Sequence, residues 1–133
     1  MKFVKILAVL VLTYIGSVIA FEAWLGYYQP KSDSTLIITT TDADGSGYNR
    51  VLARLETDNK VYVAVNHWPR AWYYRVLDQP DVKVTFNQAT NEAVAVPVIG
   101  AEFEQVNGQY ALSTAFRILT GFPPRRLLRL DPT

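Results

Sequence analysis

Leu36-Ile37-Ile38-Thr39-Thr40-Thr41 is the stretch on which the fold depends, because a short β-branched run of this kind predicts a strand. The residues after it, 42–47, are rich in the glycine and aspartate of tight connections. We expect a return strand over 48–56 and a hairpin turn over 57–60. The turn leads into Val61-Tyr62-Val63-Ala64-Val65, which is apolar enough to be buried on both faces. Three consecutive strands therefore predict a meander.

Further along the chain, the pattern predicts two short helices and three more strands. A helix is expected from Pro69 to Leu77, because proline is well tolerated in a first helical turn. Alternation of apolar and polar residues predicts a strand over 81–87, followed by a long strand over 92–102. A second helix is expected over 107–120 and a last strand over 126–130.

Six strands joined mostly by hairpin-length loops favour a mainly β (α+β) fold, an antiparallel barrel rather than a doubly wound sheet. Closure of the sheet would also remove the exposed edges of apolar strands. Pro97 lacks an N–H group, so it predicts an edge position or a bulge in the strand that contains it.

The N-terminal segment is a candidate membrane helix. Lys2 and Lys5 precede an uncharged run from Ile6 to Phe21, which is typical of a membrane anchor or of a signal peptide. Val18-Ile19-Ala20 would pass as a cleavage site, whereas the aromatic residues over 24–28 suit the headgroup level at the end of a retained helix. We favour a retained anchor over a signal peptide and over a buried N-terminal helix.

The predicted organisation is an anchor (or signal peptide) over residues 1–28, a linker over 29–35 and a barrel domain over 36–133. Lys2 and Lys5 favour a single-pass helix with a cytoplasmic N-terminus, which places the domain on the periplasmic or outer face of the membrane. Membrane lipid is thus the first expected partner.

Composition excludes several classes of function. The chain of 133 residues has room for one domain, and its net charge of +1 argues against a nucleic-acid partner. With no cysteine and one histidine, neither a disulfide nor a thiolate or multi-histidine metal site can form. No catalytic triad, P-loop or dinucleotide fingerprint is present, so the sequence identifies no catalytic residue.

Two segments are candidates for ligand binding. Gly45-Ser46-Gly47 followed by Arg50 could form a small anion cradle, but the spacing alone favours an ordinary hairpin loop, in which short Gly-Ser-Gly turns are common. Asn66-His67-Trp68 lies between a strand and a helix, where a pocket at a barrel mouth often forms. His67 titrates near neutral pH, but a lone histidine is more often structural.

Aromatic and basic residues add to these candidates. A dense aromatic group fits stacking on a planar ring, or packing in a core or interface. Its members are Trp68, Trp72, Tyr73 and Tyr74. Arg125 and Arg126 are candidates for binding a phosphate or an acidic lipid headgroup, and otherwise flank the last strand in solvent.

The order and spacing of these segments over 36–87 resemble the deazaflavin-dependent nitroreductase (nitroreductase/quinone reductase) family. The resemblance lies in the strand 36–41, the Gly-Ser-Gly loop with Arg50, the strand 61–65, and Ala71-Trp72-Tyr73 leading to Pro80-Asp81-Val82. The C-terminal residues 126–132 are similar to the closing strand of the family. The resemblance implies a six-stranded antiparallel split β-barrel with two short helices, which binds deazaflavin or FMN.

The resemblance also implies roles for individual residues. Ser46, Gly47 and Arg50 would approach the phosphate arm of the cofactor, and Asn66 and His67 would lie beside its ring. The remaining cofactor-binding candidates are Trp68, Trp72 and Arg126.

Three positions depart from the pattern of the family. Asp44 and Gly45 stand where the family usually has a cation, and Leu52-Ala53 replaces a Thr-Pro pair. The glycine-rich loop before the helix is shortened to residues 66–69. Each lost charge-assisted contact weakens anion binding by roughly 1.5–3 kcal/mol.

Two functions follow as hypotheses. The first is a membrane-tethered oxidoreductase that uses deazaflavin or FMN to reduce nitro compounds or a lipid-soluble quinone, since the cofactor itself carries out hydride transfer. The second is a non-catalytic accessory subunit that docks on a membrane-protein partner through its barrel and aromatic residues. The departures favour the second hypothesis, and the glycine loop with Arg50 favours the first.

Overall fold

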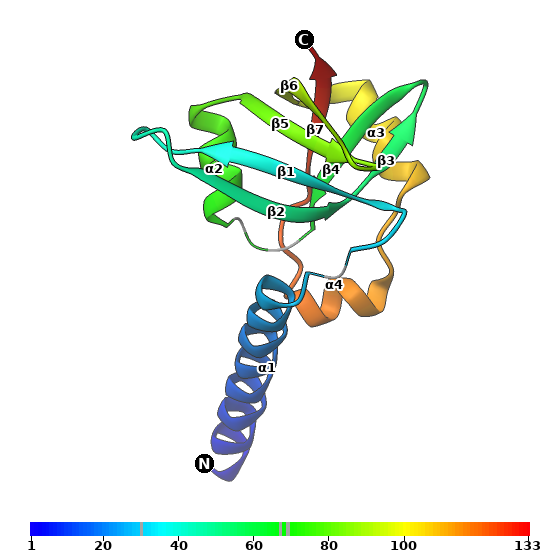
Figure 1. The fold of residues 1–133 in the computed structure, drawn as a ribbon. Coiled ribbons are helices and arrows are strands. Elements are labelled where there is room, and N and C mark those ends of the chain that lie inside the picture. Colours follow the sequence, from blue (N-terminus) through cyan, green and yellow to red (C-terminus); the bar gives the residue numbers. More distant parts are fainter. Residues whose placement is uncertain (30, 67, 69) are drawn as a thin grey trace.

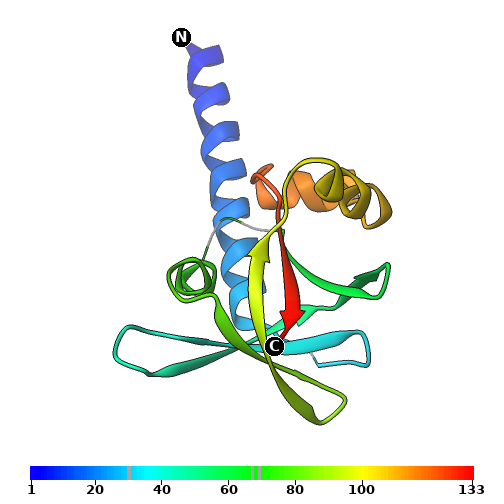
Figure 2. The same cartoon turned by 90° about the horizontal axis from the view of Figure 1, so that it is seen from above.

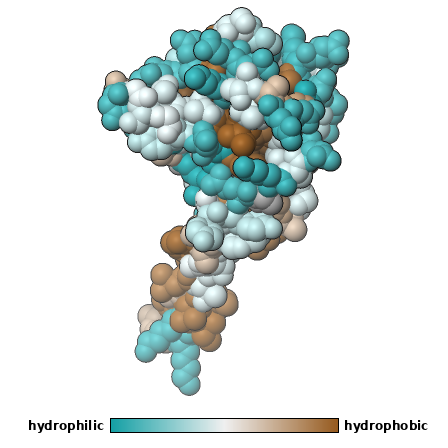
Figure 3. Space-filling model, in the orientation of Figure 1, coloured by the Kyte–Doolittle hydropathy of each residue, from teal (hydrophilic) through white to brown (hydrophobic). Residues whose placement is uncertain are grey.

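A long N-terminal helix projects from the rest of the chain, with its C-terminal end against the domain (Figure 1). The structure is a computed structural model that describes residues 1–29, 31–66, 68 and 70–133. The helix, α1 (Lys2–Tyr27), has a mean hydropathy of 2.3 and is long and apolar enough to cross a membrane. Its brown surface in Figure 3 contrasts with the largely teal and white domain.

The domain is built on one curled antiparallel sheet of seven strands, in the order β2-β1-β5-β6-β7-β4-β3. Its strands are β1 (Thr35–Thr41), β2 (Gly47–Ala53), β3 (Leu55–Thr57), β4 (Lys60–Val65), β5 (Asp81–Phe86), β6 (Ala89–Pro97) and β7 (Arg126–Pro132). Only Arg54 separates β2 from β3, although these strands form opposite edges of the sheet. The sheet must therefore curl into a half-barrel, and β2 contacts β4 across the seam.

Tight turns set the register of the hairpins. Asp58 and Asn59 adopt positive φ between β3 and β4, and Asn87 and Gln88 do so between β5 and β6. Turns with two residues of positive φ match the twist of antiparallel strands. The pairing of Asp81 with Val94 and of Phe86 with Ala89 follows from the second turn.

The strand β4 is buried on both faces, as its apolar sequence predicts. Val63 and Val65 belong to the main core, which also contains residues of α2 (Ala71–Asp78) such as Trp72 and Val76. On the other face, Tyr62 belongs to a second core with residues of α3 (Gly100–Gln109) and β7. Figure 2 shows α2 on one side of α1, and α3 with α4 (Thr114–Thr120) on the other.

Several predicted elements differ from the structure. The described residues form seven strands and four helices, α1 included, rather than six strands and two short helices after an anchor, because the segment 48–56 divides at Arg54 and the segment 107–120 divides into two helices. Ser113 begins the second of these, since its hydroxyl accepts a hydrogen bond from the Phe116 N–H. The predicted strand over 92–102 is also wrong, because it ends at Pro97 and α3 begins at Gly100.

The meander and the position of Pro97 need correction as well. β1 pairs with β2 and β3 pairs with β4, but these hairpins lie at opposite ends of the sheet order. Pro97 is the last residue of β6, an internal strand, and pairs with Leu128 of β7. The pairing of β6 with β5 extends only to Val94, so Pro97 needs no N–H donor on that side.

Candidate functional site

The C-terminal half of α1 docks on the barrel along one face. Residues 1–17 are exposed, whereas side chains at a spacing of three and four residues are partly buried from there on. They are Val18, Phe21, Glu22, Leu25 and Gly26. The helix α1 and the barrel thus meet at a defined contact surface, which we call the joint.

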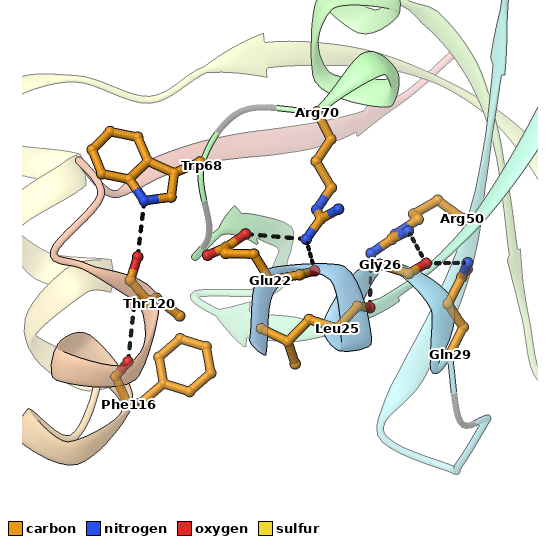
Figure 4. A network of polar contacts seen from close by, with 9 residues as sticks. All are labelled: Glu22, Leu25, Gly26, Gln29, Arg50, Trp68, Arg70, Phe116 and Thr120. Carbon is orange, nitrogen blue, oxygen red and sulfur yellow. Dashed lines mark hydrogen bonds and ion pairs between the residues drawn. The ribbon is translucent and has the colours of Figure 1, made fainter. Parts of the chain in front are cut away.

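Two arginines of the barrel bind the last turns of α1 (Figure 4). Arg50 of β2 donates from Nη1 to the Gly26 carbonyl oxygen at 3.0 Å and from Nη2 to the Leu25 carbonyl oxygen at 3.3 Å. Arg70, just before α2, donates from Nη2 to the Glu22 carbonyl oxygen and forms an ion pair of 3.0 Å with the Glu22 carboxylate. The last four carbonyls of a helix, which here include those of Leu25 and Gly26, lack partners within the helix and carry its negative dipole end, so Arg50 is well placed there. Arg70 lies one turn earlier, where the Glu22 carboxylate supplies the opposite charge.

The joint buries charge. Burial lowers the pKa of Arg50, and the nearby charge of Arg70 lowers the pKa further, but a guanidinium remains protonated in proteins. The Nε atoms of Arg50 and Arg70 are buried without a hydrogen-bond partner among the described residues. Gly26 lies so close to Arg70 that a Cβ at this position would overlap with Nη1 of Arg70. A larger residue at Gly26 would therefore displace the guanidinium.

The β1–β2 loop, which contains the predicted anion cradle, is hydrogen-bonded within itself. The Ser46 N–H donates to the Asp44 carboxylate at 2.9 Å, and the Gly45 N–H donates to the Asp42 carbonyl oxygen at 3.0 Å. The hydrogen bond from Ser46 lowers the pKa of Asp44. Gly47 begins β2 and pairs with Thr41. The Asp44 carboxylate thus already accepts a hydrogen bond from the Ser46 N–H group, which a bound anion would need.

A pocket of about 380 Å³ lies between the end of β4, the helices α3 and α4 and the segment before β7. Its lining includes Asn66, Asn107, Arg117, Phe122 and Arg125, and no acidic side chain among the described residues. Its volume falls in the range typical of small-molecule sites, roughly 300–1,000 Å³. Two cations and two amides give it the chemistry to bind an anionic or polar planar ligand.

Arg125 is held rigidly in this pocket. It donates from Nε to the Asn66 side-chain oxygen at 3.0 Å, and from Nη1 to the Asn107 side-chain oxygen at 2.9 Å and the Tyr110 carbonyl oxygen at 2.7 Å. Burial lowers the pKa of Arg125. Its orientation is therefore fixed before any ligand enters.

The structure places the predicted site residues in several different environments. Asn66 lines the pocket, and the indole N–H of Trp68 donates to the Thr120 carbonyl oxygen of α4 at 2.9 Å. Trp72 is 3% exposed and lies in the core, and the Arg126 guanidinium lies over the ring of Tyr73, 5.5 Å from its centroid. Ser46 and Gly47 lie in or beside the β1–β2 loop, and Arg50 lies at the joint. His67 lies outside the described residues.

The aromatic residues do not form one surface patch. Trp72 and Tyr73 are buried, whereas Trp68 and Tyr74 are exposed. Sequence reasoning missed Arg70, Glu22 and Arg117 as members of the joint or the pocket, because the contacts of these residues are with segments distant in the chain.

Comparison with solved structures supports the split-barrel fold, while no protein-family model and no curated protein sequence matches the chain. An F420-H2 dependent reductase (FDR-A) aligns with a TM-score of 0.59 and 20% identity over 74% of this chain and 94% of that chain. The heme storage protein HutZ from Vibrio cholerae aligns with a TM-score of 0.60 and 20% identity over 77% and 83% of the two chains. PhzG from Burkholderia lata, in complex with tetrahydrophenazine-1-carboxylic acid, aligns with a TM-score of 0.57 and 15% identity over 77% and 67%. At these identities the likeness shows the fold alone, which is a split barrel.

Proposed function

We propose that this chain is a membrane-anchored oxidoreductase of the split-barrel type, which binds deazaflavin or FMN and reduces a lipid-soluble quinone or nitro compound. The observation that carries the proposal is the pocket beside Asn66, which is lined by Arg117 and Arg125 in a fold like that of an F420-H2 dependent reductase. An anchored domain suits a substrate that partitions into lipid. The proposed orientation places the domain on the periplasmic or outer face of the membrane, as Lys2 and Lys5 favour.

The residues of the pocket fit the ring and polar groups of such a cofactor. Arg125 offers an oriented guanidinium, Asn66 and Asn107 offer amide groups, and the ring of Phe103 offers an apolar face. When bound, a flavin or deazaflavin supplies hydride transfer. The contribution of the chain itself is to bind and orient the cofactor.

The phosphate arm of the cofactor fits poorly at its predicted site beside Ser46 and Arg50 while α1 is docked on the barrel. Arg50 is bound to the carbonyls of α1, and the Ser46 N–H is bound to Asp44. These contacts favour Arg117 and Arg125, rather than Arg50, as the cations that meet an anionic group of the ligand. They also support the second candidate, a non-catalytic accessory subunit that docks on a membrane-protein partner.

Ligand titration distinguishes the two candidates. The full chain is purified in detergent, its visible absorbance is recorded, and FMN and a deazaflavin are titrated in turn. The reductase proposal expects binding at micromolar ligand, weakened at least tenfold in Arg125→Ala, since a hydrogen bond to a charged group contributes roughly 1.5–3 kcal/mol. Arg117→Ala, at an exposed residue, tests the same pocket without risk to the core.

Lys83→Ala is the matched control, because Lys83 is an exposed cation on β5 outside the pocket. It should bind like the unaltered chain. Failure of both cofactors to bind at micromolar concentration would reject the reductase. Copurification of a stoichiometric membrane protein would then support the accessory subunit.

A further inference from the structure

The helix α4 packs directly against the anchor. The Tyr14 hydroxyl of α1 donates to the Ile118 carbonyl oxygen at 2.8 Å. The rings of Phe21 and Phe116 meet edge to face, with centroids 6.0 Å apart. These contacts place α4 beside the middle of α1 rather than at its C-terminal end.

The free part of the anchor is too short to cross a bilayer. From Lys2 to Tyr14 the helix rises about 18 Å, at about 1.5 Å per residue. The hydrocarbon core of a bilayer is about 30 Å thick and takes about 20 helical residues to cross, and any tilt increases that number. If Lys2 lies at one boundary of the core, the other boundary falls near Glu22, and α4 lies on the lipid side of it.

The surface of the domain at this depth exposes three large apolar side chains. Ile118, Leu119 and Phe122 are 44%, 47% and 54% exposed, although each is a large hydrophobic side chain. Their surface is continuous with α1, because Ile118 bonds to Tyr14, and Gly121, next to Phe122, lies against Val18. In water such a cluster beside a hydrophobic helix would be unfavourable, whereas in lipid it needs no cover.

We propose that α4 and the turn through Phe122 form a second membrane contact, in which Ile118, Leu119 and Phe122 enter the acyl chains of the nearer leaflet. The guanidinium of Arg117 lies 5.7 Å from the Phe122 ring centroid and remains in the lining of the pocket. The pocket, which Arg117 and Phe122 also line, then opens at the bilayer surface, where a lipid-soluble substrate is concentrated. This inference rests on the proposed function, since it requires α1 to span the membrane.

Spin labels measure depth directly, and the absence of native cysteine allows single-cysteine variants of the full chain. Leu119→Cys and Phe122→Cys are labelled in vesicles of phosphatidylcholine and phosphatidylglycerol. Leu10→Cys, within the anchor, is the lipid control. Asn91→Cys, on β6 beside the β5–β6 turn, is the aqueous control, since that turn lies at the opposite end of the molecule from the N-terminus (Figure 2).

The ratio of label accessibility to oxygen over a water-soluble nickel complex should be severalfold higher at positions 10, 119 and 122 than at position 91. All four side chains are exposed, so the labels should not disturb the fold. If label 10 is lipid-protected and labels 119 and 122 match label 91, the second contact is refuted while the anchor stands. If label 10 is also in water, both the membrane-spanning helix and the second contact are refuted. The cofactor titration then tests the reductase proposal separately.

Discussion

The guanidinium Nη1 of Arg50, in β2, donates a hydrogen bond of 3.0 Å to the carbonyl oxygen of Gly26, near the end of α1. The strand that the family resemblance assigns to a cofactor phosphate therefore holds α1. A helix C-terminus and a phosphate both present oxygen atoms with negative charge, so the same cation suits either one. This relationship links the position of the anchor to the chemistry of the barrel.

Arg50→Ala should loosen the joint, because the Leu25 and Gly26 carbonyls lose their charged donor. Losing roughly 1.5–3 kcal/mol of hydrogen bonding makes local opening at least tenfold more frequent. Trypsin cleavage after Lys31, between α1 and β1, measures this opening. An Arg50→Ala chain that is cleaved no faster than Lys83→Ala would show that these hydrogen bonds do not hold the anchor.

Gly26→Ala should loosen the same joint for a steric reason. The added methyl group overlaps with Nη1 of Arg70 and forces it away from Glu22. Gly16→Ala, on the same helix, meets no atom within 4 Å and is the matched control. Faster cleavage after Lys31 is expected only for Gly26→Ala, and equal rates for the two variants would contradict the close approach.

Removing one partner of the Glu22–Arg70 ion pair should lower the stability of the fold more than neutralising both partners. The Glu22 side chain is only 13% exposed, so Arg70→Ala leaves a poorly solvated carboxylate at a cost of about 1–3 kcal/mol. Glu22→Gln combined with Arg70→Ala removes that charge and should recover part of the loss. Thermal unfolding in detergent compares the single and double variants, and a double variant less stable than Arg70→Ala would refute the argument.

Stability at alkaline pH should depend on Tyr62. Its hydroxyl donates to Glu102 at 2.7 Å, and burial together with this hydrogen bond raises the pKa of Tyr62 from 10.0 to about 12. The unfolded chain therefore loses this proton at lower pH than the folded chain. The stabilisation is complete below pH 10 and is lost as the pH rises to about 12.

Urea unfolding across that pH window tests the prediction. Tyr62→Phe should show a smaller loss of stability with rising pH than the unaltered chain. Tyr74→Phe changes an exposed ring and should keep the full loss. Parallel pH profiles for the unaltered chain and Tyr62→Phe would assign the alkaline loss to other groups.

Local patterns in the sequence were sufficient for several elements of the fold. β1, β4, α2, β5 and β7 begin and end within two residues of their predicted positions, because alternation, turn residues and Pro69 act over short distances. The antiparallel barrel-like class was also correct.

Distant contacts explain the differences. The residues after Pro97 are apolar enough to continue a strand, but Gly100 has a φ of 67° and Val106 packs with Tyr62 and Leu127, which favours α3. The order of strands in the sheet depends on the pairing of β1 with β5 and of β4 with β7, neither of which leaves a local signal. The local sequence therefore could not show that the first strands do not form a meander.

The candidate site was predictable only in part. Asn66 lines a pocket in the structure, at the end of a barrel strand, where a pocket commonly forms. The partner of Arg50 was not predictable, because Gly26 lies in a segment with the composition of a membrane helix. The cofactor roles of Ser46, Gly47, Arg50, Asn66, His67, Trp68, Trp72 and Arg126 stay predictions.

The one-residue link at Arg54 has a mechanical consequence for the barrel. Since β2 and β3 form the two outer strands of the sheet, the peptide bonds at Arg54 join the two edges of the sheet covalently. Motions that widen the barrel interior must hinge at Arg54 and separate β2 from β3 at the end of these strands that lies away from it. A longer connection at this residue would remove this constraint and let the sheet become less curved. Surface loops ordinarily accept insertions, but we expect the barrel to tolerate them least at Arg54.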